Sequence, residues 1–400
     1  MNRSKLIHIV GGGFNQVPLV KRAKALGMRV LVSDSNIDPP ARAFADLYEQ
    51  IDTTEREATL HAAEKHRIDF VTTDMTDVAV PTVAYVAEKL GLPGIGYETS
   101  LRFTNKHVMR SSLAGTLGKH VPESHFFAEV PEALEFLSGL DPGATYLVKP
   151  VNSQGSKGVS ILEPRSAQNS GLVRNSHNES RGRGILIERY IRGFEYSVES
   201  FVRDSKVHNL TLTKKYHYAE NPCLDERNTF LGDVDAELER ELFRVNSEII
   251  RTLGLPFGMT HAEYKIEDGI VYLMEIAARG AGGSISSHIV PYLTEFDTLN
   301  ALLKVYTDQP FEIQYRDYKE RFAVLKFYNF VPGRVKRIIH NPVLTQSALV
   351  FAFPLKEGDV IHPPRDSRDR TGYFVVHGPD RERVLQQEKV VESAVQIEYG

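Results

Sequence analysis

Residues 261–283 read HAEYKIEDGIVYLMEIAARGAGG, two largely apolar runs on either side of an Asp268-Gly269 turn. Apolar and polar residues alternate in the second run, and this pattern with an Asp-Gly turn predicts a β-hairpin. Glu263 lies on the first strand and Glu275 on the second, at similar distances from the turn. Cross-strand neighbours on one face have Cβ atoms about 5 Å apart. The sequence therefore predicts two carboxylates side by side.

A cation between the two acids would explain this arrangement, because carboxylates that close repel each other otherwise. Oxygen ligands completed by phosphate suit Mg²⁺, with Mn²⁺ as the alternative ion. Arg279 follows, and then Gly280, Gly282 and Gly283, which let the backbone approach a ligand closely. The competing interpretation is a solvated hairpin edge that carries incidental acids, and this stretch alone leaves both interpretations open.

The composition restricts the class of protein. A chain of 400 residues predicts two to three domains of roughly 100–200 residues each. Its formal charge of −4 gives no basic field for nucleic acid or an anionic membrane. Cys223 is the single cysteine, so no disulfide framework forms and a reducing, cytoplasmic location is expected. No apolar run of about 18 residues occurs, and no membrane span or signal peptide is expected.

The first 95 residues predict an open parallel α/β domain of three layers. A strand, the loop Gly11-Gly12-Gly13, a helix and a strand ending at Asp34 form a βαβ unit. Ligands bind such sheets at the carboxyl ends of the strands, where Asp74 and Asp77 also fall. Asp77 is interpreted in part as a helix N-cap. The loop lacks the third glycine of the dinucleotide fingerprint, which weakens the alternative of a nicotinamide-dependent oxidoreductase.

The next hundred residues mix helices with short strands. Residues 98–119 predict a helix on which Lys106 and Arg110 share a face, interpreted as solvated. Short strands follow as far as residue 191, with a helix at 131–138 between them. The polar segment 165–183 predicts a short helix and a mobile loop.

A glycine-rich loop joins two of these strands. It reads PVNSQGSKGVS at 150–160 and precedes a strand, so it is not a Walker A loop. Such a loop can cover phosphates with its N–H groups, and a plain β-turn is the alternative. Lys149 ends the apolar strand before it, where burial is costly without an anion. It is either a phosphate ligand or an edge residue that reaches solvent.

The remaining segments complete the chain. Residues 207–219 predict a strand, 219–232 a polar loop and 235–253 a helix. After the hairpin come two helices with a break near 291–296. From about residue 320 several strands and a helix at 380–392 predict a small α+β module.

The order of these motifs resembles the ATP-grasp superfamily. The motifs are GLPG followed by a helix that Lys106 opens, YLVKP with the Ser/Gly loop 153–158, IERYIRGFEYSVE, and HAEYK with LMEIAARGAGG. The resemblance runs from about residue 5 to 400 and is closest to the carboxylate–amine ligases, such as L-amino acid ligases. Biotin carboxylase and carbamoyl-phosphate synthetase are more distant relatives. It implies an α/β and α+β ATP-grasp fold with a Rossmann-like N-terminal domain (1–97), an ATP-grasp domain (98–312, lid subdomain about 115–190) and a C-terminal part (313–400) that completes the ligase core.

The resemblance also implies nucleotide-binding roles, with ATP and Mg²⁺ as cofactors. Lys106 and Lys149 would contact ATP phosphates. The lid over the β- and γ-phosphates would comprise Ser153, Gly155, Ser156 and Gly158. The hinge that holds adenine through backbone groups would comprise Glu188, Arg189, Tyr190 and Ile191. Glu195 would accept ribose hydroxyls.

The metal and substrate roles follow in the same way. Glu263 and Glu275 would bind Mg²⁺, and Arg279 would hold the substrate carboxylate or the acyl phosphate, which makes Arg279 and Lys149 the catalytic candidates. Many members have Asn two residues after the second Glu, whereas this chain has Ala277. Water would then complete the metal shell, or the chain would hold one metal ion less firmly.

The predicted function is an ATP-dependent, ADP-forming ligase that joins amino acids, or similar acids and amines, by an amide bond through an acyl phosphate. A carboxyphosphate-using carboxylase or a nucleotide-biosynthesis ligase is the alternative within the fold. The small-molecule acid and amine are not identified by the sequence, and a homodimer is expected by analogy. Candidate substrate residues are Glu220, His261, Arg279, Gly282, Gly283 and His288, with Arg227 as a further candidate.

Overall fold

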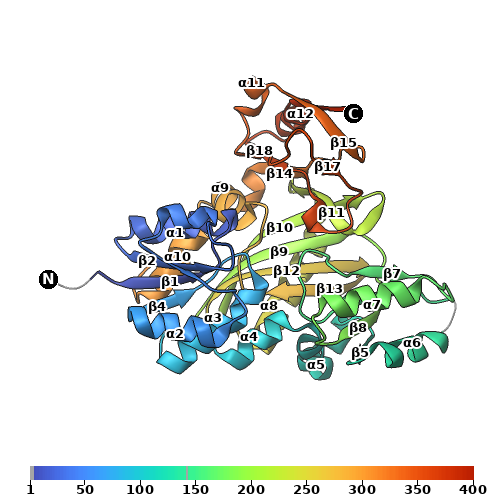
Figure 1. Ribbon diagram of the computed structural model, residues 1–400, viewed down its shortest axis with the longest axis horizontal. Coiled ribbons are helices and arrows are strands. Elements are labelled where there is room, and N and C mark those ends of the chain that lie inside the picture. The colour runs from blue at the N-terminus through green and yellow to red at the C-terminus, as the bar shows by residue number, and fades with distance from the viewer. Residues whose placement is uncertain (1–3, 141–142) are drawn as a thin grey trace.

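A computed structural model describes residues 4–140 and 143–400. The N-terminal sheet is parallel, with the strand order β3-β2-β1-β4. Alternate residues of β1 face opposite layers: Ile7 and Ile9 pack with helix α1, whereas Leu6 and Val10 pack with α2 and α3. Figure 1 shows these helices on both faces of the sheet. The predicted three-layer arrangement is confirmed. The elements are β1 (Leu6–Val10), α1 (Val17–Ala25), β2 (Arg29–Asp34), β3 (Leu47–Gln50), α2 (Arg56–His66), β4 (Phe70–Thr72) and α3 (Val80–Leu90).

The helix predicted over 98–119 is two helices, α4 (Tyr97–Thr104) and α5 (Lys106–Leu117). Asn105 separates them and caps α5, because its side-chain oxygen accepts hydrogen bonds from the N–H groups of His107 and Val108. The interpretation of a solvated Lys106–Arg110 face is wrong, since both side chains are buried. They reach β13, where each finds an oxygen partner.

A second, antiparallel sheet has the order β5-β8-β6-β7. Figure 1 shows it with its two helices on the side away from the N-terminal layers. The predicted helix within 165–183 is present as α7. The elements are β5 (Ser124–Phe127), α6 (Val130–Ser138), β6 (Tyr146–Pro150), β7 (Ser160–Leu162), α7 (Asn169–Glu179) and β8 (Ile185–Arg189).

The central sheet is large, with the order β13-β12-β9-β10-β11-β14-β18-β16. Helix α8 packs on one face, where Tyr264 Oη donates to Asn246 Oδ1 at 2.8 Å. The opposite face carries charged side chains. The strands and helix are β9 (Glu195–Arg203), β10 (Lys206–Tyr218), β11 (Asn221–Phe230), α8 (Ala236–Leu253), β12 (Gly258–Glu267), β13 (Ile270–Ala277), β14 (Phe322–Phe327), β16 (Val350–Ala352) and β18 (Tyr373–Gly378).

The prediction of a loop over 219–232 is wrong, because most of this segment forms strand β11. This strand pairs with β10 on one side and β14 on the other. Backbone groups in such a position are satisfied by both neighbours, so the ladder outweighs the low strand propensity of a polar sequence.

The C-terminal part extends the central sheet and adds a small sheet of order β17-β15-β19. The helix break predicted near 291–296 is observed at 295–297, between α9 and α10, because residues 291–294 belong to α9. The domain division at residues 97 and 312 stays a proposal. Within the described residues, every helix is too short or too polar to cross a lipid bilayer. The elements are a π-helix (Ile285–Ile289), α9 (Val290–Thr294), α10 (Thr298–Tyr306), β15 (Gly333–His340), α11 (Pro342–Thr345), β17 (Val360–Ile361), α12 (Arg381–Glu392) and β19 (Val395–Tyr399).

One glycine at the entry to the central sheet gives a stability test. Gly193 has φ +100°, and a Cβ there would overlap the carbonyl oxygen of Ile266. Gly193→Ala is therefore expected to lower the free energy of unfolding by about 1–3 kcal/mol, measured by urea denaturation. Gly171, in α7, has open space around its Cα. Gly171→Ala should raise stability by up to about 1 kcal/mol, and equal effects of the two variants would contradict this account.

Candidate active site

The two acids of the hairpin lie opposite each other. Glu263 on β12 pairs with Glu275 on β13. Strict counting outward from the turn would pair Glu263 with Met274, and a register shift between Glu263 and Tyr264 moves it opposite Glu275. Glu263 Oε1 accepts hydrogen bonds from Lys215 Nζ and, at 3.1 Å, from His261 Nε2. Glu275 Oε1 accepts one from Lys106 Nζ at 2.8 Å. The predicted juxtaposition is confirmed, and each carboxylate is compensated by a cation.

The donor set of this pair fits a hard cation. The contacts from Lys106, Lys215 and His261 all use Oε1, and no residue that the structure describes donates a hydrogen bond to Oε2 of either carboxylate. Free carboxylate oxygens are the ligands that Mg²⁺ prefers. No group of three His, Cys, Asp or Glu side chains among the described residues forms a cage by itself. Phosphate or water oxygens would therefore complete the shell.

Lys149 lies in a cluster of buried charged side chains next to β13. Its Nζ contacts Glu188 Oε2 at 2.5 Å and the carbonyl of Met274 at 3.4 Å. Arg110 binds the other oxygen of Glu188 through Nε at 2.9 Å. Burial lowers the pKa of Lys149 to about 8, although Glu188 opposes this shift. Burial would raise the pKa of Glu188, but Arg110 and Lys149 outweigh it and the pKa is lowered.

Lys106 reaches the same strand from helix α5. Its Nζ donates to the carbonyl of Ser153 at 2.7 Å as well as to Glu275. Lys149 contacts Met274, so the two lysines meet at consecutive residues of β13. The structure therefore brings Lys106, Lys149, Glu263 and Glu275 together, and their roles toward a nucleotide remain predictions.

The glycine-rich loop spans three parts of the molecule. Gln154 Oε1 accepts a hydrogen bond from the N–H of Asp77 at 2.8 Å. Ser156 Oγ donates to the carbonyl of Cys223 at 2.6 Å, and the N–H of Ser367 donates to the carbonyl of Gly155 at 3.1 Å. Gly158 has φ +71°, and a Cβ there would lie 2.9 Å from the ring of Pro150. The loop thus connects the N-terminal layers with β11 and the C-terminal part.

The predicted adenine hinge has limited free backbone. The N–H groups of Arg189 and Tyr190 already donate to the carbonyls of Glu123 and Thr145. Within the described chain, the N–H of Ile191 donates to no carbonyl or side chain, so it is available to a ligand. Glu195 accepts hydrogen bonds from Lys215 Nζ at 3.1 Å and His217 Nε2 at 3.2 Å.

Arg279 and His261 each bind an acid. Arg279 forms two hydrogen bonds with Asp77, from Nε at 2.8 Å and from Nη2 at 2.9 Å. The interpretation of Asp77 as an N-cap is wrong, because its short 3-10 helix is preceded by Thr76 and no side chain caps it. His261 Nδ1 contacts Glu199 at 2.5 Å. Burial would lower the pKa of His261, but Glu199 and Glu263 raise it to about 9, so the ring is protonated at neutral pH.

The other substrate candidates lie in the turn between β10 and β11, in β11, and in the segment after β13. Glu220 is exposed at the turn between β10 and β11, and His288 lies in the π-helix beside Ser287. A Cβ at Gly283 would approach Leu325, whereas Gly282 has open space. Arg227 pairs with Glu388 of α12. Their roles remain predictions.

Three residues that the sequence analysis did not select hold the cluster together. Arg110 forms an ion pair with Glu188. Lys215 contacts both Glu195 and Glu263. Glu199 binds His261 and favours its protonated form. Lys215 could have been found from the alternation of its strand. Thr211, Thr213 and Lys215 occupy every second position, which places them on one polar face. For Arg110 the signal was its position one helical turn after Lys106.

Two family models match the chain. An ATP-grasp domain matches residues 143–288, and L-amino acid ligase C-terminal domain 2 matches residues 330–400. A formate-dependent phosphoribosylglycinamide formyltransferase from Synechococcus sp. (strain CC9902) is 24% identical over 189 residues, 47% of each chain. The chain therefore spans about half the length of curated relatives such as this one.

Solved structures resemble the whole chain. The L-amino acid ligase from Bacillus licheniformis superposes with a TM-score of 0.82 at 22% identity and covers 100% of both chains. The biotin carboxylase domain of Hydrogenobacter thermophilus 2-oxoglutarate carboxylase, a dimer with MgADP, ADP and bicarbonate, gives a TM-score of 0.73 at 14% identity and covers 100% of this chain and 91% of that one. The protein thus has the ATP-grasp fold, with an ATP-grasp domain at residues 143–288 and an L-amino acid ligase C-terminal domain 2 at residues 330–400.

Proposed function

We propose that this protein is an ATP-dependent, ADP-forming ligase that joins the carboxylate of one amino acid, or similar acid, to the amine of another. The observation that carries the proposal is the convergence of two lysines and two carboxylates on β13, with Arg279 two residues beyond its end. The similarity to an L-amino acid ligase over the full chain supports the choice of substrate class.

The nucleotide would lie between the glycine-rich loop and β13. Lys106 and Lys149 would neutralise its phosphates, and the N–H groups of residues 153–158 would cover them. The N–H of Ile191 would contact adenine, and Glu195 the ribose. Glu263 and Glu275 would hold Mg²⁺, or Mn²⁺, which supplies charge neutralisation on the phosphate oxygens when bound.

The first step activates the acid. A carboxylate oxygen of the substrate attacks the γ-phosphorus, the bond from that phosphorus to the bridging oxygen breaks, and ADP leaves with the bonding electrons. The product is an acyl phosphate, a far better electrophile than a carboxylate. Phosphoryl transfer depends on positioning and charge neutralisation, and Lys106, Lys149 and Arg279 provide both.

The second step forms the amide. The amine nitrogen attacks the acyl carbon, an oxyanion forms, and its collapse expels phosphate while the nitrogen loses a proton to solvent. Arg279 stabilises the oxyanion with its N–H groups. The loop 151–159 excludes water, which would otherwise hydrolyse the acyl phosphate.

The proposal includes the setting of the enzyme. The acid and the amine are its small-molecule partners, with Gly282, Gly283, His261, Glu220 and His288 as candidate contacts. A cytoplasmic homodimer is part of the same proposal, supported by the single cysteine and by a dimeric structural neighbour. Light scattering measures the assembly state.

A pairwise screen tests the reaction. Amino acids and other acids are offered in pairs with Mg-ATP, and phosphate and ADP are measured. Release is expected to require both an acid and an amine, with equal amounts of amide and ADP. Lys149→Ala should reduce the rate roughly 100-fold, whereas the exposed Lys206 can be changed to Ala without effect. ADP release driven by bicarbonate alone would instead identify a carboxylase.

The low pKa of Lys149 predicts a pH dependence for nucleotide binding. The charged ammonium attracts phosphate and is lost as the pH rises through about 8, so kcat/KM for ATP should fall above that pH. Lys149→Arg keeps its charge over this range and should lose this limb of the profile, even if its overall rate is lower. The same fall near pH 8 in Lys149→Arg would show that another group is responsible.

A further inference from the structure

The loop that follows β4 forms hydrogen bonds with the loop that follows β13. Asp74 Oδ1 accepts a hydrogen bond from the N–H of Gly280 at 3.0 Å. Three residues later, Asp77 binds the side chain of Arg279 through both carboxylate oxygens. The N-terminal layers therefore hold both the backbone and the side chain at the end of the central hairpin.

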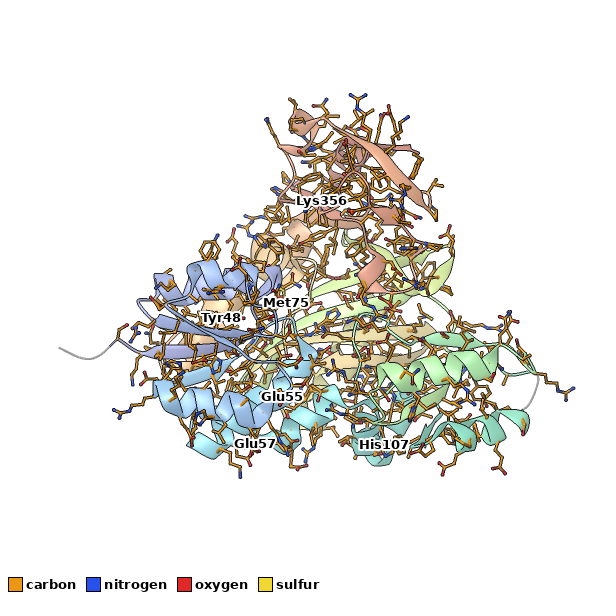
Figure 2. The ribbon with its side chains drawn as sticks, viewed as in Figure 1. Tyr48, Glu55, Glu57, Met75, His107 and Lys356 are labelled. Atoms are coloured by element: carbon orange, nitrogen blue, oxygen red, sulfur yellow. The ribbon has the colours of Figure 1, made fainter. Side chains whose placement is uncertain are left out.

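The geometry of this contact is tightly determined. A Cβ at Gly280 would lie 2.7 Å from Asp74 Oδ1, so only glycine allows this approach. Met75, between the two acids, is buried and has φ +58°, which costs about 1–3 kcal/mol for a residue with a Cβ. Figure 2 labels Met75 at the border between the N-terminal layers and the central sheet.

Two glutamines brace the strained loop. Gln16 Nε2 donates to the carbonyl of Asp74 at 2.5 Å and to Thr76 Oγ1 at 3.0 Å. Gln154, from the glycine-rich loop, accepts the N–H of Asp77. Strained backbone persists where its surroundings over-determine it, and such positions concentrate at functional sites.

Asp77 accepts hydrogen bonds from only some of the N–H groups of the Arg279 guanidinium. A guanidinium has five N–H groups. Nε and one N–H of Nη2 bind Asp77, and one N–H of Nη1 binds the carbonyl of Gly280 at 3.0 Å. One N–H on Nη1 and one on Nη2 remain, and no partner for them occurs among the residues that the structure describes. These two N–H groups can donate to a second carboxylate or phosphate.

We propose that Asp77 is a positioning residue of the ligase reaction: it holds one edge of the Arg279 guanidinium so that the two remaining N–H groups face the carboxylate of the acid substrate. This inference rests on the function proposed above. Both side chains are largely buried, so the pair is held with little solvent competition. Without the Asp77 carboxylate, the long side chain of Arg279 has several rotamers available and loses its fixed direction.

A structural role and a positioning role have different kinetic consequences. A pair that only joins two layers affects the free energy of unfolding and leaves the kinetic constants alone. A pair that orients Arg279 affects the acid substrate and the chemical step, whereas ATP is held by Lys106 and Lys149. The ratio of the KM values for the two substrates separates these roles.

The test compares Asp77→Asn with the wild-type enzyme, using the acid and amine found by the pairwise screen. The amide keeps the size of the side chain but places an N–H donor against Arg279. The KM for the acid is expected to rise on the order of tenfold, equivalent to one lost charged contact of about 1.4 kcal/mol, and kcat is expected to fall. The KM for ATP should stay within about twofold.

Two further variants serve as controls. Asp77→Glu keeps the charge and should restore part of the affinity for the acid; it also supplies the test if Asp77→Asn does not fold. Asp46→Asn removes another acid of the N-terminal layers, one that binds Lys24 and the N–H of Val30. It should lower stability but leave both KM values unchanged.

The outcomes separate this inference from the proposed function. An active wild type with an unchanged KM for the acid and an unchanged kcat in Asp77→Asn overturns the inference alone. A proportional loss of affinity for both substrates also overturns it, because it indicates a general structural role. A wild type that is inactive with every pair overturns the proposed function and this inference with it.

Discussion

Compensation of buried charge is the constraint on which this site depends. Glu263 and Glu275 lie opposite each other, and carboxylates at that spacing are tolerated only when cations accompany them. Lys215 and His261 serve Glu263, and Lys106 serves Glu275. Because these cations come from different elements, the helices and strands that carry them are fixed relative to the hairpin. The charge pattern thus sets the geometry of the whole face.

Three parts of the chain meet at the end of β13 because the charged side chains there need partners of opposite charge. Arg110 and Lys106 arrive from α5, Lys149 from the antiparallel sheet, and Asp77 from the N-terminal layers. Desolvating a charge is costly unless its partner has good geometry, so each of these contacts restricts how the parts can be arranged. A ligase needs this restriction, because an acyl phosphate survives only where acid, amine and nucleotide are held together without water.

Local patterns in the sequence predicted the parts of the site that depend on near neighbours. The Asp268-Gly269 turn placed Glu263 and Glu275 at similar distances along paired strands, although strict counting puts Glu263 opposite Met274. A register shift between Glu263 and Tyr264, which no local pattern predicted, brings Glu263 opposite Glu275. The position of Lys149 at the end of an apolar strand left a phosphate ligand and a solvent-reaching edge residue as alternatives, and the structure shows that the side chain is buried. Long-range partners were not predictable in this way: Asp77 and Arg279 are far apart in the sequence and meet only through the packing of two sheets. The residues of β11 look like a loop because many of their side chains are polar, and two of these, Asp225 and Arg227, pair with charged residues of the C-terminal part. Their backbone is nevertheless paired on both sides.

The cost of this face argues that it exists for a ligand. Hydrophobic residues of similar volume often stabilise a fold as well as buried ion pairs do, or better, and the other face of the same strands is packed with residues such as Val198 and Tyr264. At the charged face Lys106, Lys149 and Lys215 each contact a carboxylate. In the proposed reaction, phosphate would take the place of Glu275 at Lys106, and the freed carboxylate would turn to the metal ion. Such an exchange leaves no charge without a partner, so the arriving nucleotide meets a site that is already polarised and needs little reorganisation.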